Sequence, residues 1–577
     1  MVATELSTQS KANEPSLLTV ERAAYGAVLL LALVMRFIQL DAYPLSTEEI
    51  SHALAAWDAV QGRSVDLSGL SPLLFSLQEI TFFVTGGGDL WARWWPAWLG
   101  ALMCLLPYGL RSRLGREGAI LAALALATSP TLIYFSRHGT GDIIAGAALL
   151  ALLSAISLPQ SSSRRALWIG MAAGLGIISG PVWYTGLLAG IVAWALLRRK
   201  QAADALRIDG AQLRAISGAA AITAVLIGTG LLSHWEGIGA AFDLLGTWAQ
   251  RLTPSTVSYP IYWPILRLIL DEPLLVALGM YGAWRAWRRE DREGQMLTAW
   301  AGIALAWTIV TPGRQPQDLI VVVIPLALLA GRELGRILPR LDLRAARWEA
   351  LAVIGALSTL MGTAYVWASG YGLLGQATHL IALVAPVGLI ISTTLMSVWW
   401  LGWPLTRQIL VIFALLSGSL WTFSAGWINS HGTDRWRRVA VQFEMTAQEV
   451  KELPAFMERL SEQRVGDPYL LAIDLVDSPE VPILRWYLRR WPVRVVGAPR
   501  GEQRAPVVIT PLGEDLVPGE AYRGQRLRVR EWWLPEGMQP SQWLRWLLVR
   551  QSVIEPAVSE VILWVEVEKP IAETPGA

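Results

Sequence analysis

The stretch Ala23–Leu40 reads AAYGAVLLLALVMRFIQL and carries one charged residue, Arg36. A run of ~20 mostly apolar residues is long enough to cross the hydrocarbon core of a bilayer as a helix. Similar runs recur as far as Gln408–Trp427, and the same length rule gives about 13 of them. The sequence therefore predicts a mostly α-helical protein that crosses a membrane many times.

The overall composition agrees with this prediction. Of the 577 residues, 53% are hydrophobic and only 16% are charged, and the mean hydropathy is +0.41. These values are typical of an integral membrane protein. The net charge of +2 argues against nucleic acid as a partner. Because Cys104 is the single cysteine, neither an internal disulfide nor a cysteine metal cluster can form.

Arginine placement predicts the orientation, because short cytoplasmic loops retain positive residues. Arginines gather after every second predicted span, as in residues 111–116 and 285–292, whereas the alternate loops 233–262 and 311–318 carry one arginine each. Residues 1–20 are too polar to be a signal peptide and are expected to form a cytoplasmic tail. An odd number of spans then places the first loop and the C-terminal part outside.

Three parts follow along the chain: the tail, a transmembrane domain over 21–428, and an extracytoplasmic α/β domain over 429–577. In the last part, charged and shorter patterns replace the long apolar runs. There we expect an amphipathic helix over 441–463 and further helices over 483–490 and 542–550. We expect strands over 469–475, 506–510, 526–532 and 561–567.

The first outer loop, residues 41–90, contains two adjacent carboxylates, Glu48 and Glu49. The segment from Ser46 to Glu49 reads STEE and precedes apolar residues at helical spacing. This pattern is typical of a capped amphipathic helix on the membrane surface, with Ser46 as the cap and Glu49 at the third helical position. In this interpretation both carboxylates stabilise the start of the helix. A functional role is the alternative interpretation, since charged residues at a membrane boundary often serve a function.

A further carboxylate, Asp142, follows Arg137 between the third and fourth predicted spans, on the same side as Glu48. Taken alone, Asp142 is equally well explained as a helix cap, and Arg137 as an arginine that extends to the membrane interface. Three carboxylates and an arginine on one side of the first four spans favour a shared site.

Four segments resemble a known family: EEISH over Glu48–His52, GDLWARWWPAWLG over Gly88–Gly100, LGREG over Leu114–Gly118, and SPTLIYFSR over Ser129–Arg137 with Asp142. They are similar to the N-terminal half of GT-C glycosyltransferases of family 39, which include protein O-mannosyltransferases and the aminoarabinose transferase. Within this family, the sequence is most similar to the branch associated with flippase activity. The resemblance implies a GT-C-type membrane domain with an extracytoplasmic α/β domain.

The resemblance also implies a function: transfer of a sugar from a polyprenyl-phosphate donor to a glycan, lipid or protein acceptor at the outer membrane face, with inversion. A carboxylate can remove the acceptor's proton. The leaving phosphate needs a cation, either an arginine or a divalent metal ion. Glu48 stands where the family has aspartate and is the expected base, with Glu49 assisting and Asp142 as the second acidic residue. Arg137 and Arg93 match family positions expected to bind substrate.

Other polar residues permit two interpretations each. His52 shares a helix face with the two glutamates and either binds a metal or substrate or forms hydrogen bonds at the interface. Arg93 also fits an interface anchor beside tryptophans. His234, Glu236 and Arg251 either line an entrance for the lipid phosphate or are solvated loop residues.

A second class of function is open as well, because a scaffold can outlast its chemistry. The chain is then a non-catalytic membrane partner or transporter that assists flipping of lipid-linked sugars. A structure that brings Glu48 and Asp142 into one cavity favours the enzyme.

Overall fold

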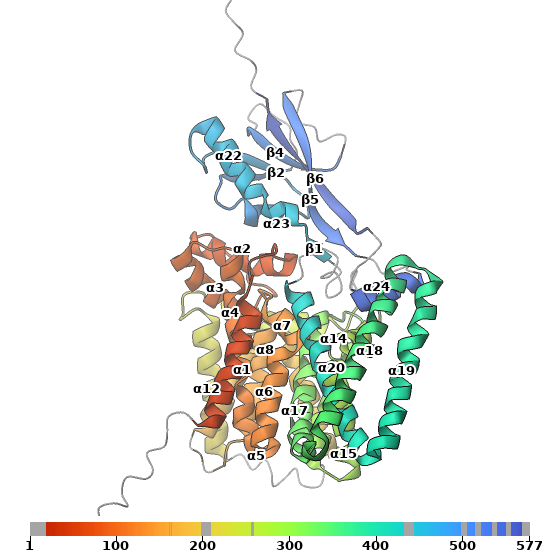
Figure 1. Cartoon of the computed structure of the whole chain (residues 1–577). Helices are drawn as coiled ribbons and strands as arrows, with labels where there is room; N and C mark the ends of the chain where they lie inside the picture. The colour runs from red at the N-terminus through yellow and green to blue at the C-terminus, as the bar shows by residue number, and fades with distance from the viewer. Residues whose placement is uncertain are drawn as a thin grey trace, which may run out of the picture.

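The computed structural model describes residues 19–160, 162, 164–197, 209–254, 259–431, 444–497, 505–513, 521–533, 539–549 and 555–567. The predicted cytoplasmic tail lies outside these residues except for positions 19 and 20. Helices form a bundle through residue 431, and a domain that contains all the described strands stands at one end of the bundle (Figure 1).

The bundle begins with α1 (Val20–Phe37), which the first apolar run predicts. The remaining bundle helices are α4 (Asp89–Met103), α5 (Arg111–Leu114), α6 (Arg116–Thr128), α7 (Pro130–Ser136), α8 (Asp142–Ile156), α9 (Arg165–Ile177), α10 (Val182–Leu197), α12 (Gly210–Gly228), α13 (Glu236–Gln250), α14 (Trp263–Asp271), α15 (Pro273–Arg288), α16 (Arg292–Val310), α17 (Ile320–Ile337), α18 (Arg347–Leu374), α19 (Ala377–Leu401) and α20 (Trp403–His431). Short 3-10 turns connect several of them, at Leu106–Leu110, Pro316–Leu319, Leu338–Arg340 and Arg344–Ala346.

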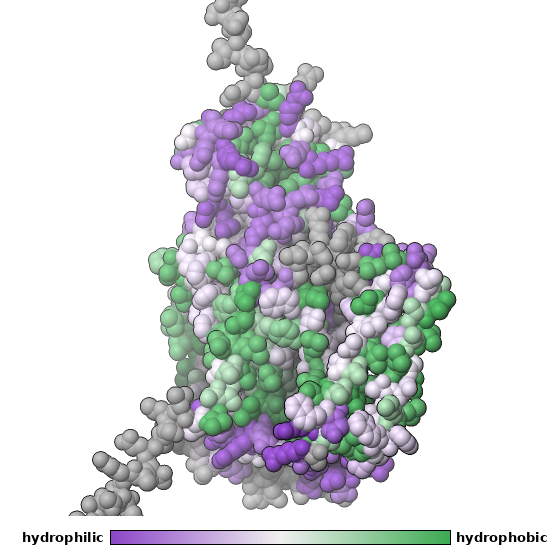
Figure 2. Space-filling model, viewed as in Figure 1, coloured by the Kyte–Doolittle hydropathy of each residue, from purple (hydrophilic) through white to green (hydrophobic). Residues whose placement is uncertain are grey.

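The bundle has the surface of a membrane protein. Among the described residues, α12, α18, α19 and α20 are long and apolar enough to cross a bilayer, and α6 with α7 adds a fifth span if the bent pair counts as one. The shorter apolar helices are α8, α9 and α10, of which α9 packs with α12, α8 with α7, and α10 with α8. Hydrophobic side chains cover the flank of the bundle, while polar ones gather at the lower end and on the upper domain (Figure 2). The protein is therefore a multi-pass membrane protein, and the number of about 13 spans stays a prediction.

A bend of 59° separates α6 from α7, at Pro130. The proline ends the hydrogen-bond ladder, so carbonyls at the end of α6 need other donors. Arg36, fully buried on α1, supplies them: its guanidinium donates to the carbonyls of Leu126 at 3.3 Å and Ala127 at 3.2 Å, and to Ser136 Oγ at 3.1 Å. This contact fixes the end of α7 and thereby the loop that leads to Asp142.

The C-terminal domain is a mixed sheet with the strand order β1-β5-β6-β4-β2-β3. β2 pairs in parallel with β3 and β4, and the other pairs are antiparallel. The strands are β1 (Glu444–Thr446), β2 (Ile473–Val476), β3 (Val493–Val496), β4 (Val507–Pro511), β5 (Tyr522–Trp532) and β6 (Ala557–Glu566), and the helices are α22 (Leu453–Val465), α23 (Val481–Tyr487), α24 (Pro540–Val549) and a 3-10 turn at Gln448–Lys451.

Four of these strands fall where the sequence predicts them, at β2, β4, β5 and β6. The predicted helix over 441–463 is wrong from residue 444 to 452, because β1 and the 3-10 turn precede α22 there, and positions 441–443 lie outside the described residues. β3 is missed as well. α20 continues to His431, so the bundle extends slightly past the predicted boundary at 429.

The sheet domain and the first loop share one hydrophobic core. The loop helices are α2 (Thr47–Val60) and α3 (Pro72–Thr85), which lie between the bundle and the sheet (Figure 1). Ile50 and Ala53 of α2 are fully buried in the same cluster as Ile483 and Trp486 of α23. Burial of this kind contributes roughly 25 cal/mol per Å² of apolar surface, so the domain is firmly attached to α2.

Candidate functional site

The helix α2 begins as the sequence predicts. Ser46 caps it: the Ser46 hydroxyl accepts from the Glu49 N–H, and the Glu49 carboxylate accepts from the Ser46 N–H at 2.8 Å. This is a complete capping box. Because successive side chains on a helix point about 100° apart, Glu48 and Glu49 face different surroundings. The two glutamates therefore have different environments.

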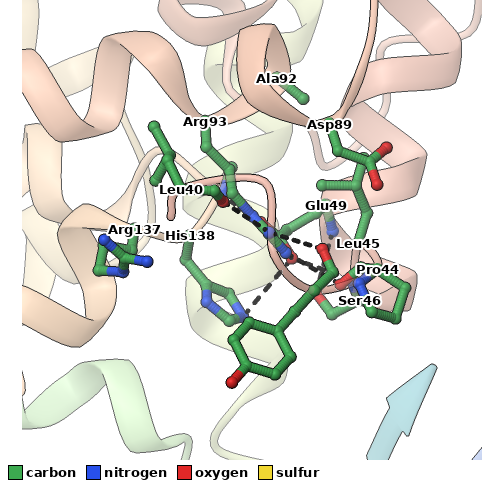
Figure 3. Close-up of polar contacts among 12 residues, drawn as sticks. Leu40, Pro44, Leu45, Ser46, Glu49, Asp89, Ala92, Arg93, Arg137 and His138 are labelled. Carbon is green, nitrogen blue, oxygen red and sulfur yellow. Dashed lines mark hydrogen bonds and ion pairs between the residues drawn. The ribbon is translucent and has the colours of Figure 1, made fainter. Parts of the chain in front are cut away.

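Glu49 is fully buried and its two carboxylate oxygens are saturated (Figure 3). Arg93 of α4 donates to both oxygens, from Nε to Oε1 at 2.6 Å and from Nη2 to Oε2 at 2.8 Å. The Gly139 N–H donates to Oε1 at 2.7 Å, and His138 Nε2 lies 3.9 Å from Oε2. Glu49 thus ties α2 to α4 and to the loop after α7.

The charge state of Glu49 follows from these contacts. Desolvation alone would raise the pKa of Glu49, but the charges of Arg93 and His138 and the hydrogen bonds from Arg93 and Ser46 outweigh it and hold this pKa well below its usual range. A carboxylate that is ionised and fully bonded is a poor proton acceptor. In this geometry Glu49 holds the structure together, which agrees with the capping interpretation, while its role in assisting Glu48 stays a prediction.

Arg93 and Arg137 fix the chain between α1 and α2. Arg93 donates to the carbonyls of Leu40, Tyr43 and Pro44 at 2.9 to 3.1 Å. Arg137 donates to the carbonyls of Arg36, Ile38 and Gln39 at 2.7 to 2.9 Å and so closes the C-terminal end of α1. Both arginines, expected to bind substrate, are buried and bound to backbone.

Arg93, Arg137 and Glu49 border a cavity of about 760 Å³ between the bundle and the sheet domain. We call it the interdomain cavity. From the sheet domain, its wall includes Thr446, Glu449, Glu452 and Glu531. Glu48 and Asp142 are not among its lining residues.

Glu48 and Asp142 line a second cavity of about 220 Å³, which we call the Glu48 cavity. Six segments meet there: α2, the turn before α3, the start of α8, the turn before α10, the end of α13, and the 3-10 turn at Pro316–Leu319. Its lining residues are Glu48, Ser51, His52, Gly69, Leu70, Ser71, Thr140, Gly141, Asp142, Ser179, Gly180, Pro181, Leu244, Thr247, Arg251 and Gln317. The structure thus brings together two of the three predicted carboxylates.

Glu48 has a perturbed acidity. The side chain is exposed and lines the Glu48 cavity. Desolvation by the surrounding protein, followed by the negative charge of Asp142, raises the pKa of Glu48 to about 7, although the positive charge of Arg251 opposes the shift. A carboxylate with this pKa can accept a proton near neutral pH.

Asp142 is the first residue of α8 and is buried. Its Oδ1 atom has no hydrogen-bond partner among the residues that the structure describes. An unsatisfied buried carboxylate oxygen is costly, and it can accept a hydrogen bond from a bound ligand. The helix-cap interpretation gains no support, because Gly141 is the residue at the cap position and no side-chain bond caps α8.

Arg251 is the cation of the Glu48 cavity. It follows α13, and its Nη1 donates to Asp318 Oδ1 at 2.5 Å. Asp318 also accepts from the Gln315 N–H at 3.1 Å, so the turn before α17 holds the arginine in place. The sequence leaves Arg251 open as an entrance residue and does not single out Asp318. The sequence does contain one indication of a role for Arg251, since it is the single arginine of the loop over residues 233–262.

His52 forms two hydrogen bonds that define its tautomer. The Ser71 N–H donates to Nε2 at 3.1 Å, so the proton is on Nδ1, which donates to the Glu48 carbonyl at 3.1 Å. Desolvation lowers the pKa of His52, which favours the neutral ring. With both nitrogens engaged, the hydrogen-bonded interpretation fits better than metal binding. No group of three or more His, Cys, Asp or Glu side chains within the described ranges has the arrangement of a metal site.

The sequence leaves two further positions open, His234 and Glu236, and neither of them lines the Glu48 cavity. His234 Nε2 bonds Glu79 Oε1 at 2.7 Å. Glu236 is exposed at the start of α13.

A polytopic helical bundle with a mixed sheet domain at one end, and with carboxylates beneath that domain, defines a membrane protein of the GT-C fold class. Similar solved structures support this class. The crystal structure of ArnT from Cupriavidus metallidurans in the apo state aligns with a TM-score of 0.54 at 18% identity, over 82% of this chain and 86% of that chain.

Two further structures are similar. ArnT from the same organism bound to undecaprenyl phosphate gives a TM-score of 0.51 at 18% identity over the same shares of both chains. The Archaeoglobus fulgidus oligosaccharyltransferase tethered with an acceptor peptide gives 0.43 at 10% identity, over 82% of this chain and 63% of that chain. No protein-family model matches the sequence, and no curated protein matches it. The fold is therefore shared with ArnT.

Proposed function

We propose that this protein is a glycosyltransferase of family 39 type that transfers a sugar from a polyprenyl-phosphate donor to an acceptor hydroxyl at the outer face of the membrane. One observation carries the proposal: Glu48, Asp142 and Arg251, from three distant parts of the chain, line a single cavity at the domain-facing end of the bundle. The similar fold of ArnT, whose structure was solved with undecaprenyl phosphate, supports a lipid-phosphate donor.

In the proposed reaction, Glu48 accepts the proton of the acceptor hydroxyl as the oxygen attacks the anomeric carbon of the sugar. A new bond forms between the acceptor oxygen and this carbon, and the bond from the carbon to the phosphate oxygen breaks on the opposite side, which inverts the configuration. Arg251 neutralises the charge that develops on the leaving polyprenyl phosphate. Asp142 orients the acceptor or the sugar through its unsatisfied oxygen. No step needs a metal ion.

The proposed orientation rests on charge. The arginine-rich turns occupy the end of the bundle opposite the sheet domain, where α5 lies in Figure 1. Ion pairs join them there, including Arg113 with Glu293 at 3.2 Å and Arg332 with Asp291 at 2.9 Å. Cytoplasmic placement of this basic end puts the Glu48 cavity and the sheet domain outside.

A transfer assay tests the proposal. The purified full chain in lipid nanodiscs receives a labelled polyprenyl-phosphate sugar and solubilised membranes of the source cell as acceptors. Glu48→Gln removes the base but keeps the shape, so we expect transfer to fall about 100-fold or more. Glu236→Gln is the matched control, since Glu236 is exposed and outside the cavity, and it should transfer at the wild-type rate. Equal transfer by Glu48→Gln and wild type would remove Glu48 from its role as the base, and no transfer by wild type would favour a non-catalytic role in flipping lipid-linked sugars.

A further inference from the structure

The sheet domain contacts the chain directly before the cap of α2. The Leu45 N–H donates to the hydroxyl of Tyr487 at 2.9 Å, and the Leu45 carbonyl accepts from Thr446 Oγ1 at 2.6 Å. The next contact is Thr47 Oγ1 to Glu444 Oε1 at 3.0 Å. Both backbone polar groups of Leu45 are therefore bound by side chains from a domain that begins about 400 residues later in the sequence.

The same Tyr487 hydroxyl also reaches the bundle. It donates to Asp89 Oδ2 at 3.1 Å, and the neighbouring Trp486 Nε1 donates to Asp89 Oδ1 at 2.9 Å. Asp89 is the first residue of α4, the helix whose Arg93 holds Glu49 one turn later. One buried hydroxyl thus joins the end of α23, the start of α2 and the start of α4.

A second contact holds the other half of α2. Arg485 of α23 pairs with Asp58 at 3.2 Å. Along with the shared hydrophobic core, this pair fixes how α2 lies against the sheet domain. Glu48 is three residues from Leu45, so a small shift of the first turn of α2 moves its carboxylate relative to Asp142. Reactions in enzymes tolerate displacements of ~1 Å poorly.

We propose that Tyr487 is a positioning residue, which fixes Leu45 against Asp89 and so holds Glu48 toward Asp142 in the Glu48 cavity. The sheet domain is then part of the transfer site, although none of its residues lines that cavity. This inference rests on the proposed function, since it assigns the positioned group its role as the base.

The test compares Tyr487→Phe with Tyr469→Phe in the full chain in nanodiscs. Tyr469 is the matched control, because the hydrogen bonds of its hydroxyl to described residues, Glu458 and Arg490, stay within the sheet domain. For Tyr487→Phe we expect kcat of transfer to fall about tenfold with little change in donor KM, and hydrogen exchange over residues 45–50 to become faster. Tyr469→Phe should change neither quantity. Asp89→Asn keeps the shape of the side chain that accepts the hydrogen bond from Tyr487. This variant should show the same fall in kcat and the same faster exchange over residues 45–50, but both to a smaller extent.

The two readouts separate this inference from the proposed function. Unchanged exchange over residues 45–50 in Tyr487→Phe overturns the positioning role, whatever the transfer rates are. Faster exchange with an unchanged kcat overturns it too, because the first turn then moves without consequence for transfer. If wild type itself transfers no sugar, the proposed function fails and the positioning of a base fails with it, whereas the exchange data still report whether Tyr487 clamps α2.

Discussion

Removal of the arginine that neutralises Glu49 should loosen the region around the site. The perturbation is Arg93→Gln, which leaves the Glu49 carboxylate buried with the backbone donors of Ser46 and Gly139 and with His138 Nε2 at 3.9 Å. The side chains of Arg93 and Glu49 are only 6% and 0% exposed. Loss of one partner from a buried ion pair costs about 3 to 5 kcal/mol, because the other charge stays desolvated. The lost bonds to the Leu40, Tyr43 and Pro44 carbonyls act in the same direction.

Hydrogen exchange of the amides in α2 measures this cost locally, since exchange requires the helix to open. A loss of about 3 kcal/mol corresponds to more than 100-fold faster exchange where local opening governs the rate. The matched control is Arg63→Gln, which breaks an ion pair to Asp58 on the same helix. Arg63 is 57% exposed, so its pair contributes no more than about 1 kcal/mol and exchange should rise about fivefold at most.

Comparable exchange for the two variants would refute the reasoning, because it would mean that burial adds nothing to the Glu49–Arg93 pair. Unchanged exchange in Arg93→Gln alone would show that the capping box holds α2 without the arginine.

Three further predictions concern the Glu48 cavity. Since the pKa of Glu48 is raised to about 7 and a base must be deprotonated, transfer should be half-maximal near pH 7 and should fall as the pH decreases; a rate that is flat through this range would contradict Glu48 as base. Arg251→Gln should lower kcat about 100-fold, and Arg251→Lys should restore part of it, because a cation assists the leaving phosphate; full activity in Arg251→Gln would remove that role. Gly141→Ala should abolish transfer, because a Cβ there would overlap the Ser179 carbonyl and contact Ser71. Gly190→Ala is the control and should be neutral in the same assay, since a Cβ there meets nothing within 4 Å. Similar transfer rates for both variants would show that the loop before Asp142 adapts.

Local patterns in the sequence explain what could be predicted. The apolar runs predict the helical bundle, alternating short segments predict four strands of the sheet, and the STEE segment predicts the capping box at Ser46 and Glu49. The predicted spans place Asp142 on the same side of the membrane as Glu48, so the sequence alone could associate these two residues. Each of these inferences depends on neighbours in the sequence or on the spacing of long segments.

The separation of Glu48 from Glu49 could not be predicted, since it depends on contacts from distant residues. Arg93 and Gly139, 44 and 90 positions from Glu49, saturate its oxygens. Arg251 needs Asp318, 67 positions away, to hold it in the Glu48 cavity. β1 and β3 are short, at three and four residues, and form only because the rest of the sheet supplies their pairing edges.

The position of a bound polyprenyl phosphate tests the central claim most directly. An experimental structure of the full chain with this lipid should show phosphate density in the Glu48 cavity, within hydrogen-bonding distance of Arg251 and beside Glu48 and Asp142. Phosphate density in the interdomain cavity, with the Glu48 cavity empty, would contradict the account.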